Sequence, residues 1–556
     1  MARPGLRGAC RARSAACPPG PANVPGRSIR SRRVAAAGVG PQPATIPPLD
    51  RRRPAADGAT GGAHFYAHGV PTLRLFAAVR QAAGVSATEI DGETVAEVLD
   101  AAVARFGPAF EEQLRACRIW RNGEPADPAE AVAAGDEIAA LPPVSGGAGR
   151  TGRVAVISLH TSPLLQPGSG DSGGMNVYVR ELSAALAHRG LECSVYVRRH
   201  SDRLLPEIHV EPGVRVVHVP AGPVDLPKES LDSTLDEFTE GVLADLRLNG
   251  GVDAIHAHYW LSGVAGHRVK HALDRPLVTT FHTLGRVKQG LGGAEPPGRA
   301  RAEEEVVACS DVVCAAGPVE LDHLVRLYGA PADRVQIVAP GVEHALFSPG
   351  DPEGARAALG LGSEPVLLFV GRVQPLKGLD LAVETLGRLD GRLGRARLLV
   401  VGGPSGRQGR AELARVRGLV ASAGLADRVR FVAPQPHHRL ATYYRAADVV
   451  LVPSRSETFG LVALEAAACG AAVVAAEVGG LKTLVRHGST GYLVADRDPL
   501  SWARRVEEIL EDRLTAATMA LEAATVARGY SWDATAGLLA GCYDRLRQRR
   551  LVECLA

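Results

Sequence analysis

Ser456-Glu457-Thr458-Phe459-Gly460-Leu461-Val462-Ala463-Leu464-Glu465-Ala466 holds two carboxylates with seven residues between them and a glycine that can open a helix. The preceding run, Asp448 to Ser454, is short and apolar, as a buried strand is. Glu457 is therefore expected in the loop after that strand, and Glu465 on the helix that follows. Because open α/β sheets bind ligands beyond the carboxyl ends of their strands, the loop predicts a binding site.

The first turn of the expected helix is suited to a diphosphate. Its backbone N–H groups, at about Gly460 to Val462, have no intrahelical partners, and helix N-termini attract anions. A nearby carboxylate can then bind ribose hydroxyls. In the alternative interpretation Glu457 is a helix-dipole charge and Glu465 a solvated surface residue. The apolar and small neighbours of Glu465 argue against it, because a buried carboxylate is costly without a partner.

Apolar strands alternate with helical stretches from Arg153 onward, which predicts two parallel sheets with covering helices. A linker rich in Pro and Gly, around Phe347–Glu353, separates them. The last helix, Trp532 to Arg549, is expected to pack back across the cleft. The first sheet is expected from Val154–Leu159, Ser194–Val197, Val214–Val219, Ala254–His258, Leu277–Phe281, Val312–Ala315 and Val335–Val338. The second is expected from Val366–Val370, Leu398–Val401, Val429–Val432, Val449–Val452 and Val473–Ala476.

Two cations follow the first strand of the second sheet, in Val370-Gly371-Arg372-Val373-Gln374-Pro375-Leu376-Lys377-Gly378. Arg372 supplies a planar fork and Lys377 a point charge, and both can stabilise charge on a leaving phosphate. They are predicted to hold a diphosphate, with solvated surface charges as the alternative. The facing wall is expected in the first sheet, where Leu159-His160-Thr161-Ser162 leads into the glycine-rich turn Gly168 to Asn176. Such a turn alone also fits a flexible linker.

From Arg153 to Tyr543 the chain resembles the family 4 retaining glycosyltransferases of the GT-B type, in which two Rossmann-like domains face a cleft. Within that family it is similar to the inositol phosphate branch that begins mycothiol synthesis. The resemblance rests on Gly170-Asp171-Ser172-Gly173-Gly174-Met175-Asn176-Val177-Tyr178-Val179, His256-Ala257-His258-Tyr259-Trp260-Leu261-Ser262-Gly263, His282-Thr283-Leu284, Gly371 to Gly378, Gly402-Gly403-Pro404-Ser405-Gly406 and the glutamate pair.

The resemblance implies a donor site for a UDP-sugar. Arg372, Lys377 and the Gly173–Gly174 turn would hold the diphosphate, Glu465 the ribose and Glu457 the sugar. His282 would hydrogen-bond the sugar beside its reacting carbon, unless it is a satisfied core histidine. The other positions expected to line the donor site are Phe459, Gly460, Leu461 and Val462.

The resemblance also implies an acceptor site that grips a phosphomonoester. Two cations, a phenol and a hydroxyl suit a group whose charge approaches −2. Because the loop Gly290–Pro297 is shorter than in the family, Arg301 is an alternative to Arg299. The residues expected at the acceptor are Lys228, Tyr259, Thr283 and Arg299 on the phosphate and Asn176 on the inositol ring.

The implied reaction moves a sugar, N-acetylglucosamine in this branch, from a UDP-sugar to a phosphorylated polyol with retained anomeric configuration. In glycoside hydrolases a pair of carboxylates flanks the bond that breaks, and no such pair is found here. Front-face attack is expected, in which the departing diphosphate takes the acceptor's proton. The candidate catalytic residues are His282, Arg372, Lys377 and Glu457, with Glu457 positioning the donor. The alternative within the family is a hexose phosphate acceptor, as in sucrose-phosphate-type relatives.

Neither a metal nor a cofactor is expected, apart from the nucleotide-sugar donor (UDP-N-acetylglucosamine or UDP-glucose) as substrate. No acidic cluster accompanies the diphosphate loop. His256 and His258 share one face of a strand, but a zinc site built on them lacks its other ligands, so they are interpreted as structural.

An α+β domain is predicted at 71–147, with strands at Thr72–Phe76, Ala116–Arg121 and Asp136–Ala140 and a helix at Val95–Arg105. It resembles the small subunit of molybdopterin synthase and ThiS-like sulfur carriers, which have a ubiquitin-like β-grasp fold. The resemblance rests on Arg74-Leu75-Phe76-Ala77, Glu93-Thr94-Val95 and the tail Gly135-Asp136-Glu137-Ile138-Ala139-Ala140-Leu141-Pro142-Pro143-Val144-Ser145-Gly146-Gly147.

Such carriers activate a C-terminal glycine carboxylate, whereas here Ala148 continues the chain after Gly147. Loss of carrier chemistry in the intact chain is therefore favoured. The alternatives are cleavage after Gly147, a docking role and a misplaced gene boundary. Cleavage would release a sulfur carrier, and only then are sulfur-carrier partners expected.

Composition indicates a soluble, multi-domain protein of 556 residues that is 46% hydrophobic. Apolar runs such as Pro365 to Val370 are far shorter than the ~20 residues of a membrane-spanning helix. The net charge is +3, but eleven Arg lie in residues 1–60, so no global basic patch and no nucleic-acid partner is expected. The nine cysteines form no C-x-x-C pair, which favours reduced thiols and a cytoplasmic location.

The predicted organisation is a disordered basic tail (1–70), the sulfur-carrier-like domain (71–147), an acceptor domain (153–345), a UDP-sugar domain (355–530) and a terminal helix (531–550). The Arg-rich tail resembles a transit peptide or a twin-arginine signal only weakly, so an upstream start codon or a solvated tail is favoured. Small molecules are the expected partners, and a homodimer is compatible with the sequence.

Overall fold

The computed structural model describes residues 70–554, apart from 76, 86, 116, 123, 142–151, 169, 294 and 407. The predicted disordered tail, up to residue 69, and the glycine tail that ends at Gly147 lie outside the described residues. Within the described part, the strands form three sheets, each built from its own segment of the chain.

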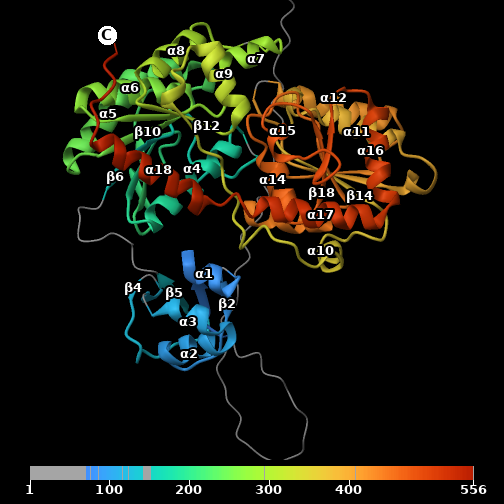
Figure 1. Cartoon of the computed structure of the whole chain (residues 1–556), viewed down its shortest axis with the longest axis horizontal. Helices are drawn as coiled ribbons and strands as arrows, with labels where there is room; N and C mark the ends of the chain where they lie inside the picture. The colour runs from blue at the N-terminus through green and yellow to red at the C-terminus, as the bar shows by residue number, and fades with distance from the viewer. Residues whose placement is uncertain are drawn as a thin grey trace, which may run out of the picture. The chain divides into compact units, whose positions relative to one another are not determined.

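The first segment folds into a small mixed sheet with its helices on one core, shown in blue in Figure 1. Its strands run in the order β2-β1-β5-β3-β4, and the first and last strands, β1 and β5, pair in parallel at the centre. Leu73, Val98, Phe110 and Ile138 are fully buried between sheet and helices. This arrangement confirms the predicted β-grasp fold. The elements are β1 (Thr72–Leu75), α1 (Ala77–Ala83), β2 (Ala87–Glu89), α2 (Val95–Phe106), α3 (Pro108–Leu114), β3 (Arg118–Arg121), β4 (Glu124–Pro125) and β5 (Glu137–Leu141).

The second segment forms a sheet in the order β13-β12-β11-β10-β6-β7-β9-β8, parallel except for its edge strand β8. Its strands read as continuous apolar runs because helices cover both faces. The strands are β6 (Arg153–Ile157), β7 (Glu192–Arg198), β8 (Glu207–Glu211), β9 (Val214–Val219), β10 (Ala254–His258), β11 (Leu277–Thr280), β12 (Val312–Ala315) and β13 (Val335–Ile337). The helices are α4 (Gly174–His188), α5 (Leu235–Leu248), α6 (Trp260–Leu273), α7 (Gly285–Gly290), α8 (Arg299–Cys309) and α9 (Pro318–Tyr328).

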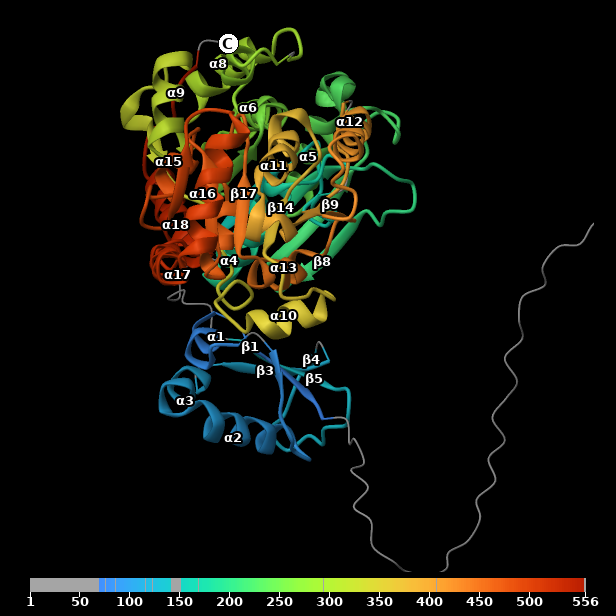
Figure 2. The ribbon, with the colours of Figure 1, turned by 90° about the vertical axis from the view of Figure 1, so that its right-hand side faces the viewer.

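The third segment forms an all-parallel sheet in the order β16-β15-β14-β17-β18-β19. In Figure 2, α11 and α16 lie over the strands β14 and β17, and both helices bury apolar residues against that face. The strands are β14 (Val366–Val370), β15 (Arg397–Val401), β16 (Val429–Val432), β17 (Val449–Val452), β18 (Ala472–Ala476) and β19 (Gly491–Val494). The helices are α10 (Pro352–Ala358), α11 (Leu379–Arg388), α12 (Gly409–Ser422), α13 (Leu440–Ala446), α14 (Leu461–Ala468), α15 (Leu481–Leu484), α16 (Pro499–Glu511) and α17 (Arg513–Ala527).

The last helix, α18 (Trp532–Arg547), returns to the second segment, as predicted. Trp532, Leu539 and Tyr543 are buried in the same core as α4 and the strands β6 and β7, and α18 runs along α4 in Figure 1. Ser531 caps the helix by accepting a hydrogen bond from the N–H of Ala534 at 3.1 Å. After the third segment is complete, the chain therefore returns to the domain that the second segment forms.

Three features differ from the sequence predictions. The strands β8 and β19 were not predicted, because the first is a polar edge strand and the second is a four-residue strand that begins at a glycine. In the small domain, the strands β2 and β4 and the helices α1 and α3 are also additional. The prediction of reduced thiols is wrong for Cys309 and Cys554, which are joined by a disulfide, although Cys117, Cys193, Cys314, Cys469 and Cys542 are free.

Candidate active site

Each large sheet has a point where strand order reverses, and the predicted site residues follow the strands at these points. In the third segment the reversal lies between β14 and β17, which are followed by Arg372 and by Glu457. In the second segment it lies between β6 and β10, followed by His160 and Tyr259. Crevices at such points are where open α/β sheets bind ligands.

The predicted diphosphate residues lie together beyond β14 and β17. The ammonium group of Lys377 is 2.6 Å from Oε2 of Glu457, which also accepts a hydrogen bond from the hydroxyl of Ser454 at 3.1 Å. Arg372 donates from Nη1 to the backbone carbonyl of Asp171, in the glycine-rich turn of the second segment, at 3.3 Å. Burial lowers the pKa of the Arg372 guanidinium, because the charge is partly removed from water.

Two helix N-termini border this cluster. A Cβ added to Gly173, just before α4, would lie 3.0 Å from Nε of Arg372. One added to Gly174, the first residue of α4, would lie 3.2 Å from the side chain of Leu461, the first residue of α14. Gly460 precedes α14 with φ of 107°, which favours glycine. The N-terminus of α4 therefore lies beside Arg372 and that of α14 lies beside α4, and helix N-termini of this kind suit a diphosphate.

Glu465 is buried, as its apolar neighbours indicated, and it has partners within the protein. Its Oε1 pairs with Nε2 of His437 at 2.7 Å, and its Oε2 accepts from the hydroxyl of Tyr444 at 2.8 Å. Burial lowers the pKa of His437, but the adjacent carboxylate outweighs this and raises it overall. The alternative of a solvated Glu465 is wrong. Its contact with a ribose stays a prediction.

His282 lies where the two large domains touch. Its φ is 61°, a strained value for a residue other than glycine, and its carbonyl accepts a hydrogen bond from the hydroxyl of Thr458 at 2.6 Å. Its Nε2 is 3.0 Å from Nδ1 of His258, which is itself fully buried. Burial lowers the pKa of His282 to about 3, so the imidazole is neutral at physiological pH and can act as a hydrogen-bonding group without adding charge.

The four predicted phosphate ligands all belong to the second segment and lie close together. The guanidinium of Arg299 donates to the hydroxyl of Tyr259 at 3.3 Å and to the carbonyl and hydroxyl of Thr283 at 2.8 and 3.2 Å. The ammonium of Lys228, on the 3-10 helix η1 (Lys228–Thr234), lies 5.2 Å from the ring centre of Tyr259. Tyr259 has φ of 78°, a second strained backbone position in the cluster.

The structure distinguishes Arg299 from Arg301. Arg299 is fully buried and pairs with Glu303 at 2.8 Å and with Glu295, whereas the side chain of Arg301 is 84% exposed and pairs with Glu305. Of the two, only Arg299 lies with Tyr259 and Thr283. Burial alone would lower the pKa of the Arg299 guanidinium, but the neighbouring Tyr259, Glu303 and Glu295 outweigh it and raise the pKa overall.

Asn176 braces the glycine-rich turn. Its amide donates to the hydroxyl of Thr161 and to the carbonyl of Ser162, both at 2.6 Å, and its Oδ1 accepts from the N–H of Gly173 at 2.9 Å. The buried side chain thereby fixes the start of α4. Its contact with an acceptor ring stays a prediction.

Several residues of the cluster were not assigned by the sequence analysis. The ring of His160 packs against that of Tyr259, with ring centres 4.4 Å apart and planes tilted by 45°. Burial together with the neighbouring cations lowers the pKa of His160 well below the usual value. Lys288 adds a further cation, 3.3 Å from Glu295. His160, Asp171 and Lys228 line a pocket of about 370 Å³, whose wall also includes Arg198. The position of His160 in the loop after β6, where the strand order reverses, is the signal that could have identified it.

Three protein-family models match this chain, each over a different segment. The model of the ThiS family matches residues 73–147, that of the glycosyl transferase 4-like domain matches 173–341, and that of glycosyl transferases group 1 matches 353–526. Among the described residues, none of the helices has both the length and the apolar character of a membrane span.

Relatives and solved structures agree with these matches. The chain is 46% identical over 412 residues to the D-inositol 3-phosphate glycosyltransferase of Xylanimonas cellulosilytica, an alignment that covers 72% of this chain and 98% of that protein. It is 47% identical over 390 residues to the enzyme of the same name from Frankia alni, covering 68% and 96%.

Among solved structures, sucrose-phosphate synthase from Thermosynechococcus elongatus superposes with a TM-score of 0.67 at 34% identity, covering 71% of this chain and 99% of that one. Anabaena HepE, solved with UDP and glucose, superposes with a TM-score of 0.58 at 19% identity, covering 71% and 99%, and so supports the GT-B fold alone. The chain is a glycosyltransferase that belongs to the D-inositol 3-phosphate glycosyltransferase family and carries a ThiS-like domain before its GT-B fold.

Proposed function

We propose that this enzyme transfers N-acetylglucosamine from UDP-N-acetylglucosamine to a hydroxyl of inositol phosphate, with retention of the anomeric configuration. The observation that supports it most is the group of Lys228, Tyr259, Thr283 and Arg299, which offers two cations and two hydroxyls to one small anion. Tyr259 and Arg299 are buried, and Lys228 and Thr283 are half-buried. The names of the related enzymes from Xylanimonas and Frankia support the same acceptor.

The donor half of the proposal rests on the cluster beyond β14 and β17. Arg372, Lys377 and the N-termini of α4 and α14 would bind the UDP diphosphate, and Phe459 to Val462 would border it. Glu465 would bind the ribose. Because Lys377 and Glu457 already form an ion pair, Glu457 is held in place to contact the sugar. HepE, which has the same fold, was solved with UDP and glucose, which supports a nucleotide-sugar donor.

The proposed reaction is a front-face displacement. The acceptor hydroxyl attacks the anomeric carbon from the side on which the diphosphate leaves, the bond to the diphosphate breaks, and its oxygen takes the hydroxyl proton. Arg372 and Lys377 stabilise the charge that develops on the leaving group, which is an effect confined to the transition state. His282, neutral because it is buried, would hold the sugar by a hydrogen bond. We place this reaction in the cytoplasm.

A UDP-release assay tests donor and acceptor together. Purified full-length enzyme is incubated with UDP-N-acetylglucosamine or UDP-glucose, each with inositol phosphate, glucose 6-phosphate or fructose 6-phosphate, and the anomeric configuration of the product is read by NMR. UDP-N-acetylglucosamine with inositol phosphate is expected to give the fastest release. Faster release with a hexose phosphate would favour a sucrose-phosphate-type acceptor, the specificity that the name of the Thermosynechococcus structure indicates for that enzyme.

Replacing Lys228 with alanine is expected to raise the KM for inositol phosphate about 10- to 100-fold, because a charge-assisted hydrogen bond is lost. The Kd for UDP, measured by calorimetry, should remain unchanged, since Lys228 lies in the acceptor pocket. Lys482→Ala, an exposed lysine outside the cluster, is the matched control. An equal loss of UDP and acceptor binding in Lys228→Ala would contradict the assignment.

The pH dependence of kcat/KM for the acceptor should also identify Lys228. Burial lowers the pKa of Lys228 to about 8 in the free enzyme, so the ammonium is present below pH 8 and lost above it. The acceptor kcat/KM, which reports the free enzyme, should therefore fall about tenfold per pH unit above that point. In Lys228→Arg, whose guanidinium stays charged, the plateau should extend to higher pH. An identical fall in both enzymes would assign the titration to another group.

The ThiS-like domain allows a second activity, because its family match ends at Gly147, the residue whose carboxylate a sulfur carrier would use. Intact-mass spectrometry of the protein from its native cells distinguishes the two cases. We expect the uncleaved chain, in which Gly147 has no free carboxylate. A product that ends at Gly147 would instead support release of a sulfur carrier.

A further inference from the structure

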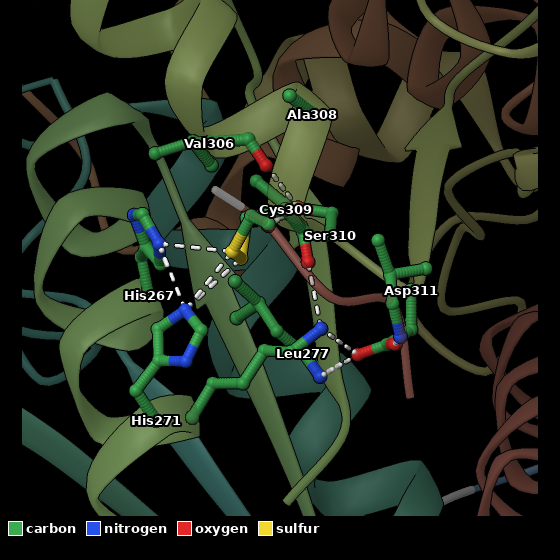
Figure 3. The surroundings of a disulfide bond; sticks show 12 residues. His267, His271, Leu277, Val306, Ala308, Cys309, Ser310 and Asp311 are labelled. Atoms are coloured by element: carbon green, nitrogen blue, oxygen red, sulfur yellow. Dashed lines mark hydrogen bonds and ion pairs between the residues drawn. A yellow bond between two sulfur atoms is a disulfide. The ribbon is translucent and has the colours of Figure 1, made fainter. Parts of the chain in front are cut away.

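Two histidines and two cysteines, from three separate stretches of chain, meet at one point outside the active site. His267 and His271 lie on α6, Cys309 is the last residue of α8, and Cys554 belongs to the tail beyond α18. Figure 3 shows the imidazole rings of His267 and His271 directed at the sulfurs of the disulfide. Their four potential ligand atoms all lie within 4.8 Å of one another.

The distances within this group fit a four-ligand metal centre. Nε2 of His271 lies 2.9 Å from the sulfur of Cys554 and 3.3 Å from that of Cys309, and Nε2 of His267 lies 3.4 Å from Cys554. The two Nε2 atoms are 3.1 Å apart. In a tetrahedral zinc site, bonds of about 2.0–2.3 Å place the ligand atoms about 3.3–3.8 Å from each other. Once the Cys309–Cys554 disulfide is reduced and its two sulfurs separate, small shifts of the side chains would therefore admit the ion.

The ligand types and their supports also suit zinc. Residues four apart on a helix face the same way, so His267 and His271 form one half of the site on α6 alone. Two thiolates and two neutral imidazoles balance the charge of Zn²⁺. The backbone of Cys309 is also held in place, because the buried ammonium of Lys270 donates to the carbonyl of Cys309 and to Asp311, both at 2.7 Å.

The tail that carries Cys554 is anchored by the same network. Oδ1 of Asp311 accepts a hydrogen bond from the N–H of Val552 at 2.7 Å, two residues before the cysteine, and its Oδ2 accepts from the N–H of Leu277 at 2.8 Å. The approach of Cys554 to α6 and α8 is thus fixed by backbone contacts as well as by its sulfur. Supports of this kind orient the ligands of metal sites.

We propose that His267, His271, Cys309 and Cys554 form a structural zinc site that fastens the C-terminal tail to α6 and α8. All four positions are filled by protein, which leaves no open position for a substrate and so distinguishes a structural from a catalytic zinc. Because α18 and the tail return to the second segment from the third, the site would fix the end of the crossing chain. The proposal is independent of the donor and acceptor assigned above.

The metal-bound form requires both cysteines as thiols, whereas the structure joins them by a disulfide. A dithiol reductant supplies the two electrons and two protons that break the S–S bond and is itself oxidised to its disulfide. Zn²⁺ then displaces one proton from each thiol and binds the two thiolates and two imidazole nitrogens. The disulfide and the zinc site are therefore two mutually exclusive states of the same four residues.

Metal content of the full-length protein tests this. Protein is reduced with dithiothreitol, incubated with one equivalent of Zn²⁺, freed of unbound metal by gel filtration in the absence of oxygen and measured by mass spectrometry of zinc. About one zinc per chain is expected, falling at least tenfold in Cys554→Ser and in His271→Ala. Cys117→Ser and His209→Ala, which change a cysteine and a histidine outside the group, should keep the zinc.

Cobalt gives a readout that does not depend on any variant. Reduced wild-type protein loaded with Co²⁺ should show the intense visible bands of tetrahedral cobalt together with thiolate-to-cobalt charge transfer, and addition of Zn²⁺ should abolish them. Less than about 0.1 zinc per reduced chain, or equal zinc in wild-type and Cys554→Ser, would overturn the proposal. Octahedral cobalt spectra without thiolate bands would overturn it as well, leaving the disulfide as the role of the two cysteines.

Discussion

Replacing Arg372 with alanine is expected to lower kcat for sugar transfer about 100- to 1000-fold, which is the usual effect of removing one preorganised charge stabiliser. The guanidinium is buried beside the N-termini of α4 and α14 and within reach of the Lys377–Glu457 pair. In such a site its charge acts on the leaving diphosphate with little screening by water. Because that charge grows only as the bond to the sugar breaks, kcat should fall more than the affinity for UDP-sugar.

Steady-state kinetics with a UDP-release readout would measure this effect, and a UDP-binding measurement would separate ground-state from transition-state loss. Arg372→Lys should recover part of the rate, since it keeps the charge but loses the planar fork. Arg455→Ala is the matched control, because this arginine follows β17 in the neighbouring loop and is exposed. A loss of less than tenfold in Arg372→Ala, or a loss confined to the acceptor KM, would show that Arg372 does not stabilise the leaving group.

The strand, loop and helix around Glu457 were predictable because each is a local pattern. The apolar run that became β17, the glycine before α14 and the apolar positions of α14 all lie within about 20 residues of sequence, where burial dictates residue type. The same reasoning found most other strands of both large sheets. It failed at β8, an edge strand whose residues are partly exposed, because a polar strand carries no periodic apolar signal.

The partners of the site residues were less predictable, since they come from distant segments. The sequence indicated that Glu465 needs a partner, but His437 and Tyr444 precede it by 28 and 21 residues and follow no spacing rule. Cys309 and Cys554 are 245 residues apart, so only the His267-x-x-x-His271 spacing on one helix could have pointed to their meeting place. Local patterns predict elements, whereas such contacts depend on how the elements pack.

Replacing Arg299 with alanine should have the largest effect on the acceptor. The fully buried guanidinium contacts Tyr259 and Thr283 and neutralises Glu303 and Glu295. Without it, the phosphate would lose a charge-assisted partner and face Glu303 without its cation, whereas Glu295 would keep its pairing with Lys288. Removing one partner of a buried, hydrogen-bonded charge pair costs about 2–5 kcal/mol, so kcat/KM for inositol phosphate should fall at least about 30-fold.

The arginine two residues along the same helix provides a matched control. Arg301 is exposed and pairs with Glu305, so Arg301→Ala should change kcat/KM less than threefold, in keeping with the small energies of surface pairs.

Because Arg299→Ala can also destabilise the fold through Glu303, whose carboxylate accepts a hydrogen bond from the N–H of Gly285, thermal unfolding is measured alongside the kinetics. Thr283→Val keeps the arginine and both ion pairs and removes only the hydroxyl. It should raise the acceptor KM without lowering the Tm. If instead Arg301→Ala lost the acceptor and Arg299→Ala kept it, the phosphate site would lie on the exposed face of α8 and the buried cluster would be purely structural.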